Sequence, residues 1–451
     1  MEREDMLFSL RAALNGDDSI VPTLVRQTHP ADMAAMLAEF EPIQVRRLLA
    51  QVAAMERAEI FGYLPAEFQL EVVQLMTRPE LVALFVEMSS DERADLYNEL
   101  PQDAQEALLP ALAQVEREDI RKLAAYEEGT VGSVMTSEYA TLTPELTARQ
   151  AVEQLRRVAP DKETIYQAYV VDELRRLIGT VSLRDLIVAP PHARVEQFMK
   201  HDPIQCRAEE AQREAAHMIS KYDLIALPVV DAEARLVGIV TYDDAMDVAE
   251  EAATTGFHKA GGSSGALGGS IRDASITSLY RSRVFWLVVL VFGNIFSGAG
   301  IAHFEETIST HLSLLFFLPL LIASAGNAGS QASTLMVRAL ATGDVLMRDW
   351  GRMLGREFLV ASLLGLTMAV AISGIGAWRG GVDIAWVVAM TMIIVVVVGS
   401  LIGMSLPFAM SRLKVDPATA SAPLVASIAD VTGVVIYFTI AAAMLGAPAV
   451  S

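Results

Sequence analysis

The sequence is poor in cysteine and in basic residues. Cys206 is the one cysteine among 451 residues, which excludes an intramolecular disulfide framework and a cysteine-rich zinc site. Asp and Glu outnumber Lys and Arg by 55 to 35, so the formal net charge is -20. Such acidity disfavours nucleic acid and anionic lipid as partners and suits cations. An acidic surface that only keeps the chain soluble would have the same composition.

Charge and hydrophobicity are segregated along the chain. Residues 271–451 carry 10 Lys and Arg against 9 Asp and Glu, which leaves 25 against 46 for residues 1–270. Most of the long apolar runs in the second part approach or exceed the ~20 residues that cross a bilayer. The sequence therefore predicts an acidic soluble half and a five-helix transmembrane domain, with spans near 284–302, 312–336, 357–378, 384–409 and 422–446.

The start of the chain and the loop charges predict the orientation. Met1–Asp5 is acidic and no long apolar core follows it, so we expect no signal peptide. Arginine and lysine are frequent before the first span and in the loops after the second and fourth spans, and rare in the other loops. The positive-inside rule then predicts a cytoplasmic N-terminus and a C-terminus outside the cell.

The soluble half contains two kinds of repeat. Residues from about 20 to 125 repeat a short unit that opens with proline, as at Pro42, Pro65 and Pro101, at a spacing of about a dozen residues. This pattern is typical of an all-α superhelical array. Within it, the acid-rich stretch Ser90–Asp95 would ordinarily be a capped, solvated first helical turn.

A hairpin-plus-helix pattern then occurs twice. The copies end in Gly179–Asp185 and Gly238–Asp244, each of the form Gly-x-Val-Ser/Thr-x-x-Asp. The duplication resembles a tandem pair of CBS domains, which are α+β modules that usually sense ligands. We therefore predict a multi-domain chain: an α-superhelical N domain at 1–128, a CBS pair at 129–252, a connecting (plug) helix and linker at 253–280, and a transmembrane pore domain at 281–451.

The last apolar run contains an aspartate, Asp430. A charge at the centre of a membrane helix costs about 3 kcal/mol or more, so such residues usually face water, an ion or a partner. Asp430 lies eight residues beyond Ala422, about 12 Å along a helix and near the membrane midplane. A polar neighbour or protonation could also neutralise it. Because no basic residue lies inside any predicted span, we favour a mobile cation.

The second span is also unusually polar. Asn327 and Gln331 are one helical turn apart in the run Ala323–Gln331, which together with Pro319 interrupts the apolar span. Backbone carbonyls freed by glycine and proline could line a wet pathway there, although interhelical hydrogen bonding explains the two amides as well. Oxygen ligands suit hard cations such as hydrated Mg²⁺. One Asp per chain cannot enclose an ion, so we predict a homodimer with a pore on its axis.

These features together resemble the MgtE magnesium channels. The motifs are Gly326–Gln331 with Arg338–Thr342, then Val415–Pro417, then Pro423–Gly433. The resemblance implies a homodimeric, Mg²⁺-selective channel of a bacterial inner membrane, which holds hydrated Mg²⁺ at Asp430 and is closed by Mg²⁺ bound to its cytoplasmic domains. It assigns the regulatory Mg²⁺ to a set of acidic residues: Asp91, Asp95, Asp244, Asp247 and the adjacent Glu250 and Glu251.

This chain departs from the family pattern in two places. The connecting segment after Glu251 is poor in acidic residues, which should weaken or relocate the Mg²⁺ lock. The resemblance also assigns Arg184 and Asp185 to a nucleotide site in the CBS pair. However, Gln167 and Leu224 stand where an aromatic side chain would stack on adenine, so the sequence argues against ATP binding.

Alternative functions remain open at this point. The same site could pass Co²⁺ or Mn²⁺, or Asp430 could carry protons in an ion-coupled secondary transporter. A membrane enzyme is disfavoured, because the membrane half contains no nucleophile–base set, metal-hydrolase motif or phosphate-binding loop.

Overall fold

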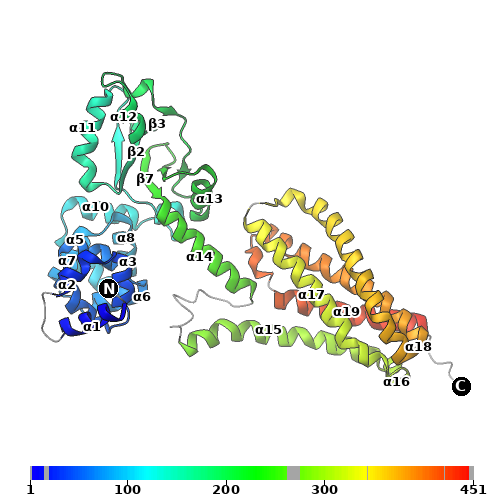
Figure 1. The fold of residues 1–451 in the computed structure, drawn as a ribbon. Helices are drawn as coiled ribbons and strands as arrows, with labels where there is room; N and C mark the ends of the chain where they lie inside the picture. The colour runs from blue at the N-terminus through cyan, green and yellow to red at the C-terminus, as the bar shows by residue number, and fades with distance from the viewer. Residues whose placement is uncertain (1–2, 15–19, 262–274, 343, 421, 446–451) are drawn as a thin grey trace. The chain divides into compact units, whose positions relative to one another are not determined.

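The computed structural model describes residues 3–14, 20–261, 275–342, 344–420 and 422–445, and Figure 1 traces the chain. The chain forms two compact units, Met1–Ala252 and Ala253–Ser451. Each unit has its own hydrophobic core. The predicted flexible linker at Gly261–Ser270 falls outside the described residues, apart from Gly261.

The first unit begins with the predicted array of short helices. Proline takes the first or second position of α3, α4 and α7, and the position just before α6 and α9. The helices are α1 (Arg3–Leu14), α2 (Ile20–Gln27), α3 (Pro30–Leu37), α4 (Pro42–Leu49), α5 (Ala54–Gly62), α6 (Ala66–Gln74), α7 (Arg78–Glu87), α8 (Ser90–Glu99), α9 (Gln102–Leu108) and α10 (Gln114–Leu123), with a 3-10 turn η1 (Leu109–Ala111) after α9.

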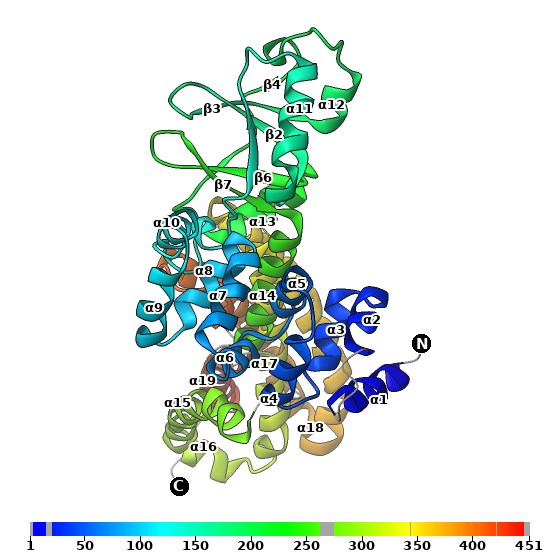
Figure 2. The same ribbon diagram turned by 90° about the vertical axis from the view of Figure 1, so that its left-hand side faces the viewer.

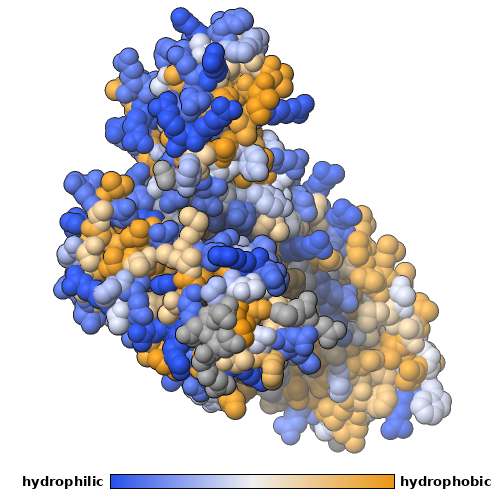
Figure 3. Space-filling model, turned by 60° about the vertical axis from the view of Figure 1, so that its left-hand side comes forward, coloured by the Kyte–Doolittle hydropathy of each residue, from blue (hydrophilic) through white to orange (hydrophobic). Residues whose placement is uncertain are grey.

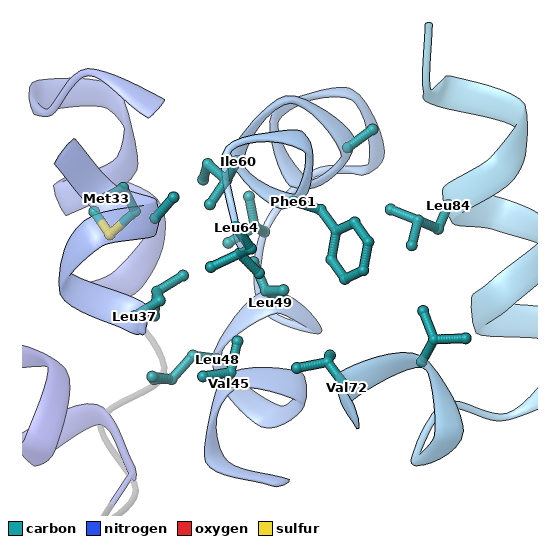
Figure 4. Packing of buried hydrophobic residues seen from close by; sticks show 14 of the residues in the cluster. Met33, Leu37, Val45, Leu48, Leu49, Ile60, Phe61, Leu64, Val72 and Leu84 are labelled. Atoms are coloured by element: carbon teal, nitrogen blue, oxygen red, sulfur yellow. The ribbon is translucent and has the colours of Figure 1, made fainter. Parts of the chain in front are cut away.

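A strict twelve-residue period builds the core of this array. An apolar residue that is at most 4% exposed recurs at every twelfth position from Leu24 to Ile120. Figure 4 shows how such side chains from successive helices point into one shared core. No helix of this length could bury its apolar face alone, so the helices stabilise one another as a stack. The nine residues are Leu24, Met36, Leu48, Ile60, Val72, Leu84, Leu96, Leu108 and Ile120.

Polar side chains that recur with the same period close several helix ends. The Nε2 of Gln69 donates to the carbonyls of Phe61, Gly62 and Leu64 at 2.9–3.1 Å. Gln105, three periods later, donates in the same way to carbonyls at the end of α8. Arginines at equivalent positions, such as Arg93, donate to the carbonyl five residues earlier. These contacts satisfy carbonyls that a helix end leaves without partners.

Two small sheets follow, one for each CBS copy. The first has strand order β1-β2-β3-β4 and the second β5-β6-β7; in each, one parallel pair precedes an antiparallel hairpin. Helices α11 (Ala148–Val158) and α12 (Leu183–Val188) lie together against the first sheet (Figures 1 and 2). The strands are β1 (Tyr139–Leu142), β2 (Thr164–Val171), β3 (Leu177–Ser182), β4 (Lys200–His201), β5 (Cys206–Arg207), β6 (Ala226–Val230) and β7 (Leu236–Thr241).

The two copies pair through equivalent residues. Arg176 and Arg235 form an antiparallel bridge, and each makes an ion pair with the aspartate four residues before it. After each hairpin a helix begins: α12 in the first copy and α14 (Tyr242–Ala260) in the second; α13 (Gln212–Tyr222) precedes β6. The predicted hairpin-plus-helix repeat is confirmed. Helix α14 continues through residue 252, the predicted end of the CBS pair.

The second unit is built from long apolar helices, four of which are long and apolar enough to cross a membrane within the described residues. They are α15 (Ile276–His303), α17 (Leu314–Ala341), α18 (Trp350–Arg412) and α19 (Ala422–Leu445); short elements α16 (Glu305–Thr310), η5 (Met347–Asp349) and η6 (Pro417–Thr419) join them. Hydrophobic residues spread broadly over the surface of this unit in Figure 3.

Helix α18 reverses direction at Gly381. This residue has φ 81° and ψ 179°, a conformation that L side chains rarely adopt. The two arms then run antiparallel: a Cβ added to Gly376 would lie 2.9 Å from Cα of Ala385, and one added to Gly365 would lie 3.0 Å from Cα of Ile393. The reversal separates the spans predicted at 357–378 and 384–409.

Removal of a repeated amide contact tests the role of the array in stability. Gln69→Met leaves three carbonyls at a helix end without their donor, so we expect a loss of about 1–3 kcal/mol in the free energy of unfolding of the first unit. Urea unfolding of the detergent-solubilised chain, followed by circular dichroism, measures the change. Gln74→Met, at an exposed position of the same helix, is the control. Equal stability of the two variants would contradict this role.

Candidate ion pathway and acidic cluster

Asp430 lies half-buried on α19, facing α17. A Cβ added to Gly326 would lie 3.7 Å from Oδ1 of Asp430 and 3.5 Å from Cβ of Ala426. The carboxylate therefore fits beside α17 because glycine occupies that position. Among the described residues, no ion pair or hydrogen bond of the Asp430 side chain is present.

The polar run of α17 forms an exposed stripe beside this contact. Asn327, Gln331 and Thr334 are exposed, and they recur at helical spacing on one face. Ser330, Gln331, Thr334 and Leu335 line a surface groove of about 440 Å³. The alternative in which glycine frees backbone carbonyls in the run Ala323–Gln331 finds no chain break there, because α17 is continuous from Leu314 to Ala341. The small residues serve close helix packing instead of a chain break.

Glycine contacts pack this part of α17 tightly against the second arm of α18. Cβ atoms added to Gly399 and Gly403 would collide with the carbonyls of Ala325 and Gly329. The two α18 glycines are one turn apart, so backbone meets backbone along a short groove. This contact leaves the face of α17 that carries Asn327 and Gln331 uncovered.

Two serines of α17 hold the start of α19. Ser330 Oγ donates to the carbonyl of Ala422 at 3.2 Å, and Ser333 Oγ donates to that of Ala420 at 2.8 Å. At the other end, the Tyr437 hydroxyl donates to the carbonyl of Leu314 at 2.9 Å. These bonds fix the register of α19 against α17, and thus the position of Asp430 along the helix pair.

Sequence reasoning missed a second carboxylate in the apolar helices, Glu357. The buried Ser400 donates its hydroxyl to Glu357, and Ser400 lies between Gly399 and Gly403. Glu357 thus joins the two arms of α18 next to their contact with α17. Glu357 is the first residue of the predicted third span, 357–378. A charge at that position is expected at the end of a loop, so the sequence did not single it out.

The first unit contains a cluster of acidic side chains between α8 and α14. Asp91 and Asp95 lie on α8, and Asp244 lies in the first turn of α14, where it accepts the Thr241 hydroxyl. Oδ1 of Asp91 is buried, and no hydrogen-bond partner for it is present in the described part of the chain. Ser90 holds α8 in place through bonds to Thr136 and Ser137. The acid-rich stretch is a helical first turn, as expected, but a partly buried one.

Burial and mutual repulsion keep these carboxylates from ionising easily. Burial raises the pKa of Asp91 and Asp244, and the charge of Asp91 raises that of Asp244 further. Burial, followed by the charge of Asp91, raises the pKa of the part-buried Glu92 to about 7. Desolvation and the charge of Asp91 also raise the pKa of Asp95, although the residue as a whole is exposed. A cation placed among them would relieve both effects.

The structure brings together some predicted residues and leaves others apart. Asp247 is exposed, and some loss of solvent around its carboxylate, followed by the charges of Asp243 and Glu250, raises its pKa. These three residues form the adjoining edge of the cluster. Glu251 is exposed. Within the described residues, no three His, Cys, Asp or Glu side chains converge closely enough to hold one ion.

Two further members come from the first CBS copy. Burial, then the charge of Glu138, raises the pKa of Glu163 to about 7. The charge of Glu163 in turn raises the pKa of Asp91. Glu163 lies at the start of β2, and its backbone N–H donates to the carbonyl of Glu138. No sequence signal relates these residues to α8. Glu92 could have been found, because it adjoins Asp91.

The predicted nucleotide residues lie at the start of α12. Asp185 accepts the Ser182 hydroxyl at 2.7 Å, in the position that Asp244 occupies in the second copy. Arg184 is exposed. Gln167 pairs with Ser182 across β2 and β3, so an aromatic side chain at position 167 would lie next to this helix start.

Known families and proteins match nearly the whole chain. The divalent cation transporter family MgtE matches residues 318–440, the MgtE intracellular N domain matches 28–129, and the CBS domain matches 131–192 and 195–251. The magnesium transporter MgtE of Thermus thermophilus is 37% identical over 448 residues, covering 98% of this chain and 99% of that protein. The corresponding transporter of Bacillus subtilis is 30% identical, covering 94% and 93%.

A solved structure supports the fold of the first unit. It is described as the cytosolic domain of the Mg²⁺ channel MgtE in complex with ATP, and it is 38% identical to this chain. The match has a TM-score of 0.51 and covers 54% of this chain and 99% of that one. The chain therefore contains an MgtE N domain and a CBS pair with its sheets, followed by the region of apolar helices.

The raised pKa values predict a pH-dependent stability. Ionising a carboxylate of raised pKa costs folded-state free energy, so the ion-free protein should lose stability as pH rises from about 4 to about 7. We expect the melting temperature of the detergent-solubilised chain to be a few degrees lower at pH 8 than at pH 6, at roughly 2–4 °C per kcal/mol. Mg²⁺ should raise it more at pH 8 than at pH 6.

Two variants localise this effect. Asp91→Asn should flatten the pH dependence, because it removes the charge that raises the pKa of Glu92, Asp95 and Asp244. Asp103→Asn, at an exposed position of the same array, should leave it unchanged. If the two variants respond alike, the cluster is not the origin of the effect.

Proposed function

The chain belongs to the MgtE family of divalent cation transporters, and on that premise we propose that it is a Mg²⁺-selective channel which cytoplasmic Mg²⁺ closes. The family consists of transporters and not enzymes, and the named relatives transport magnesium. The channel mechanism, the ion site and the gating are our proposal. The domain boundaries at residues 128, 252 and 280 are also part of this proposal.

The contact between Asp430 and Gly326, beside the exposed amides of Asn327 and Gln331, supports an ion path. Mg²⁺ holds its waters tightly, so a protein often binds it through those waters with few carboxylates. Asp430 would attract the hydrated ion, and the amide oxygens would accept hydrogen bonds from its waters. Of Asp430, Asn327 and Gln331, only Asp430 carries a charge.

We propose that two chains complete the path. One carboxylate cannot neutralise a divalent ion, whereas two copies of Asp430 across a symmetry axis can. The α17 stripe would then face its counterpart across the pore. Its exposure in a single chain is consistent with this role, because exposed polar groups on an apolar helix need water or a partner.

The proposed topology has five crossings of a bacterial inner membrane. The reversal at Gly381 divides the 63-residue α18 into two crossings, and α15, α17 and α19 provide the others. The N-terminus then lies in the cytoplasm and the C-terminus outside, in agreement with the arginine-rich loops. The first unit, with its acidic cluster, faces the compartment whose Mg²⁺ it would sense.

Gating follows from the repulsion within the cluster. At low Mg²⁺ the negative charges on α8, α14 and the first CBS copy disfavour the compact arrangement. At high Mg²⁺ bound ions bridge those charges and favour it, which shifts the population toward the closed state. We assign the bridging to Asp91, Asp95, Asp244 and Asp247, with Glu250 at the edge.

The acid-poor connecting segment has one charged contact that bears on this proposal. Lys259, near the end of α14, places Nζ 2.6 Å from Oδ2 of Asp416. Asp416 also caps η6 by accepting the N–H of Ala418, just before α19 begins. Both charges are partly exposed, so this pair contributes at most about 1 kcal/mol. In this chain the connecting segment thus contributes a lysine ion pair, whereas it lacks the additional carboxylates of the family pattern.

Replacement of Asp430 tests the ion site. Asp430→Ala removes the charge of the path, so Mg²⁺ flux into proteoliposomes should fall about tenfold or more, which corresponds to a loss of roughly 1.4 kcal/mol or more. Asp383→Ala removes an exposed carboxylate next to the Gly381 reversal and should leave flux unchanged. Unchanged flux in Asp430→Ala would refute the assignment.

Current recordings on the same protein distinguish the mechanisms. Unitary openings at fixed voltage favour a channel, whereas Mg²⁺ flux that requires a proton gradient favours a carrier that titrates Asp430. Flux of Co²⁺ or Mn²⁺ as fast as that of Mg²⁺ would indicate a broader divalent pathway.

Removal of the regulatory charges tests the gating. The variant Asp91→Asn/Asp95→Asn/Asp244→Asn/Asp247→Asn no longer repels itself and no longer binds Mg²⁺ between these faces. We expect Mg²⁺ flux to persist at high internal Mg²⁺, where the parent protein closes. Flux at varied internal Mg²⁺ in proteoliposomes measures the difference.

A charge-matched variant provides the control. Asp103→Asn/Glu106→Gln/Glu118→Gln/Glu145→Gln removes four exposed acidic residues of the same unit. It should close at the same internal Mg²⁺ as the parent. Normal closure of the regulatory variant, or loss of closure in the control, would place the sensor elsewhere.

A further inference from the structure

The first arm of α18 exposes a stripe in which charged residues give way to apolar ones. Arg352 and Arg356 are exposed and one turn apart, at the start of the helix. Four exposed apolar residues continue the same face at helical spacing: Leu359, Leu363, Leu366 and Val370. The opposite face is buried, at Ala361, Gly365, Ala369, Ile372 and Gly376. At ~1.5 Å per residue the apolar part extends about 16 Å, which is comparable to an acyl chain.

The two guanidinium groups have no partner in the described part of the chain. No hydrogen bond or ion pair of Arg352 or Arg356 is present there. The nearby carboxylates bind elsewhere: Asp349 accepts the N–H of Leu346, and Glu357 accepts the Ser400 hydroxyl. The first turn of α18 also contains no acidic residue. Because a helix N-terminus carries partial positive charge, Arg352 lies where a cation is unfavourable without an anion.

The segment before the helix has the character of a membrane interface. Leu346, Met347 and Trp350 are each about half exposed, and Arg348 lies exposed among them. Tryptophan and arginine together are typical of the headgroup level of a bilayer. Basic residues at such a level attract anionic lipids with about 1 kcal/mol each.

We propose that this stripe binds an anionic phospholipid, with the phosphate at Arg352 and Arg356 and an acyl chain along Leu359, Leu363 and Val370. Charge complementarity selects the anionic headgroup, and the apolar continuation selects a lipid over a free phosphate. The acidity of the whole chain disfavours such a partner, but the acidic excess lies in residues 1–270. This stripe lies on α18, apart from the α17 face proposed to line the pore.

Native mass spectrometry of the full chain in detergent tests the proposal. The protein is titrated with phosphatidylglycerol and with phosphatidylcholine of the same acyl chains. The parent protein should prefer phosphatidylglycerol, and Arg352→Gln/Arg356→Gln should weaken its binding on the order of tenfold. Arg352→Lys/Arg356→Lys keeps the charge and should keep most of the preference, which separates a loss of charge from a failure to fold.

A second pair of basic residues provides the matched control. Arg412→Gln/Lys414→Gln removes two exposed cations between the predicted fourth and fifth spans, on the same predicted side of the membrane. Binding of phosphatidylglycerol should then fall by less than twofold. An equal loss in both double variants would mean that general surface charge attracts the lipid and would overturn the proposal. So would competition by glycerol phosphate alone at equal concentration, or a loss of dimer in Arg352→Gln/Arg356→Gln.

Discussion

An unneutralised carboxylate among apolar helices is the constraint on which the second unit depends. Asp430 has no internal counter-charge, and burying it alone costs about 3 kcal/mol or more. Its neighbourhood therefore has to admit an ion with its waters while holding the helices close. Glycine at 326 makes room for the carboxylate, and Ser330 and Ser333 fix the start of α19. Small residues and side chain-to-backbone hydrogen bonds thus hold the helices together and leave the Asp430 carboxylate unpaired. A salt bridge would hold the helices as well, but a paired carboxylate could not attract a passing cation.

The acidic cluster of the first unit also contains carboxylates without a counter-charge, but it lies outside the apolar helices. Asp91 has a buried oxygen for which the described part of the chain offers no partner, and neighbouring charges raise the pKa of Asp244, Glu92 and Asp95. Such an arrangement is destabilising by itself and becomes favourable when a cation arrives. Within the described residues no three of these groups converge on one point, so under the proposed gating we expect bound Mg²⁺ to draw α8 and α14 toward each other. That movement is what a sensor needs, because a preformed site would bind Mg²⁺ without changing the protein.

The sequence predicted the features that arise from local repetition and failed where distant segments meet. The dozen-residue spacing and the duplicated hairpin-plus-helix are periodic, and the structure confirms them. The predicted apolar runs lie in four long apolar helices among the described residues. Glu138 and Glu163 join Asp91 only through the packing of α8 on the first CBS copy, so no pattern near them could reveal it. The polar, glycine-rich run Ala323–Gln331 left open whether glycine and proline free backbone carbonyls at that depth. In apolar helices the same residues allow backbone contact, and α17 continues.

Averages over the chain also conceal the residues that decide its behaviour. The net charge of -20 of the whole chain arises from residues 1–270, which hold 25 Lys and Arg against 46 Asp and Glu. In the second unit, acidic and basic residues nearly balance, and the position of each single charge matters. Lys259 contacts Asp416, which caps η6. A residue of the connecting helix therefore contacts the segment that leads into the helix carrying Asp430. An exposed pair is weak and screened by salt. A weak contact is nevertheless suited to gating, because a strong one would hold the helix in one state regardless of Mg²⁺.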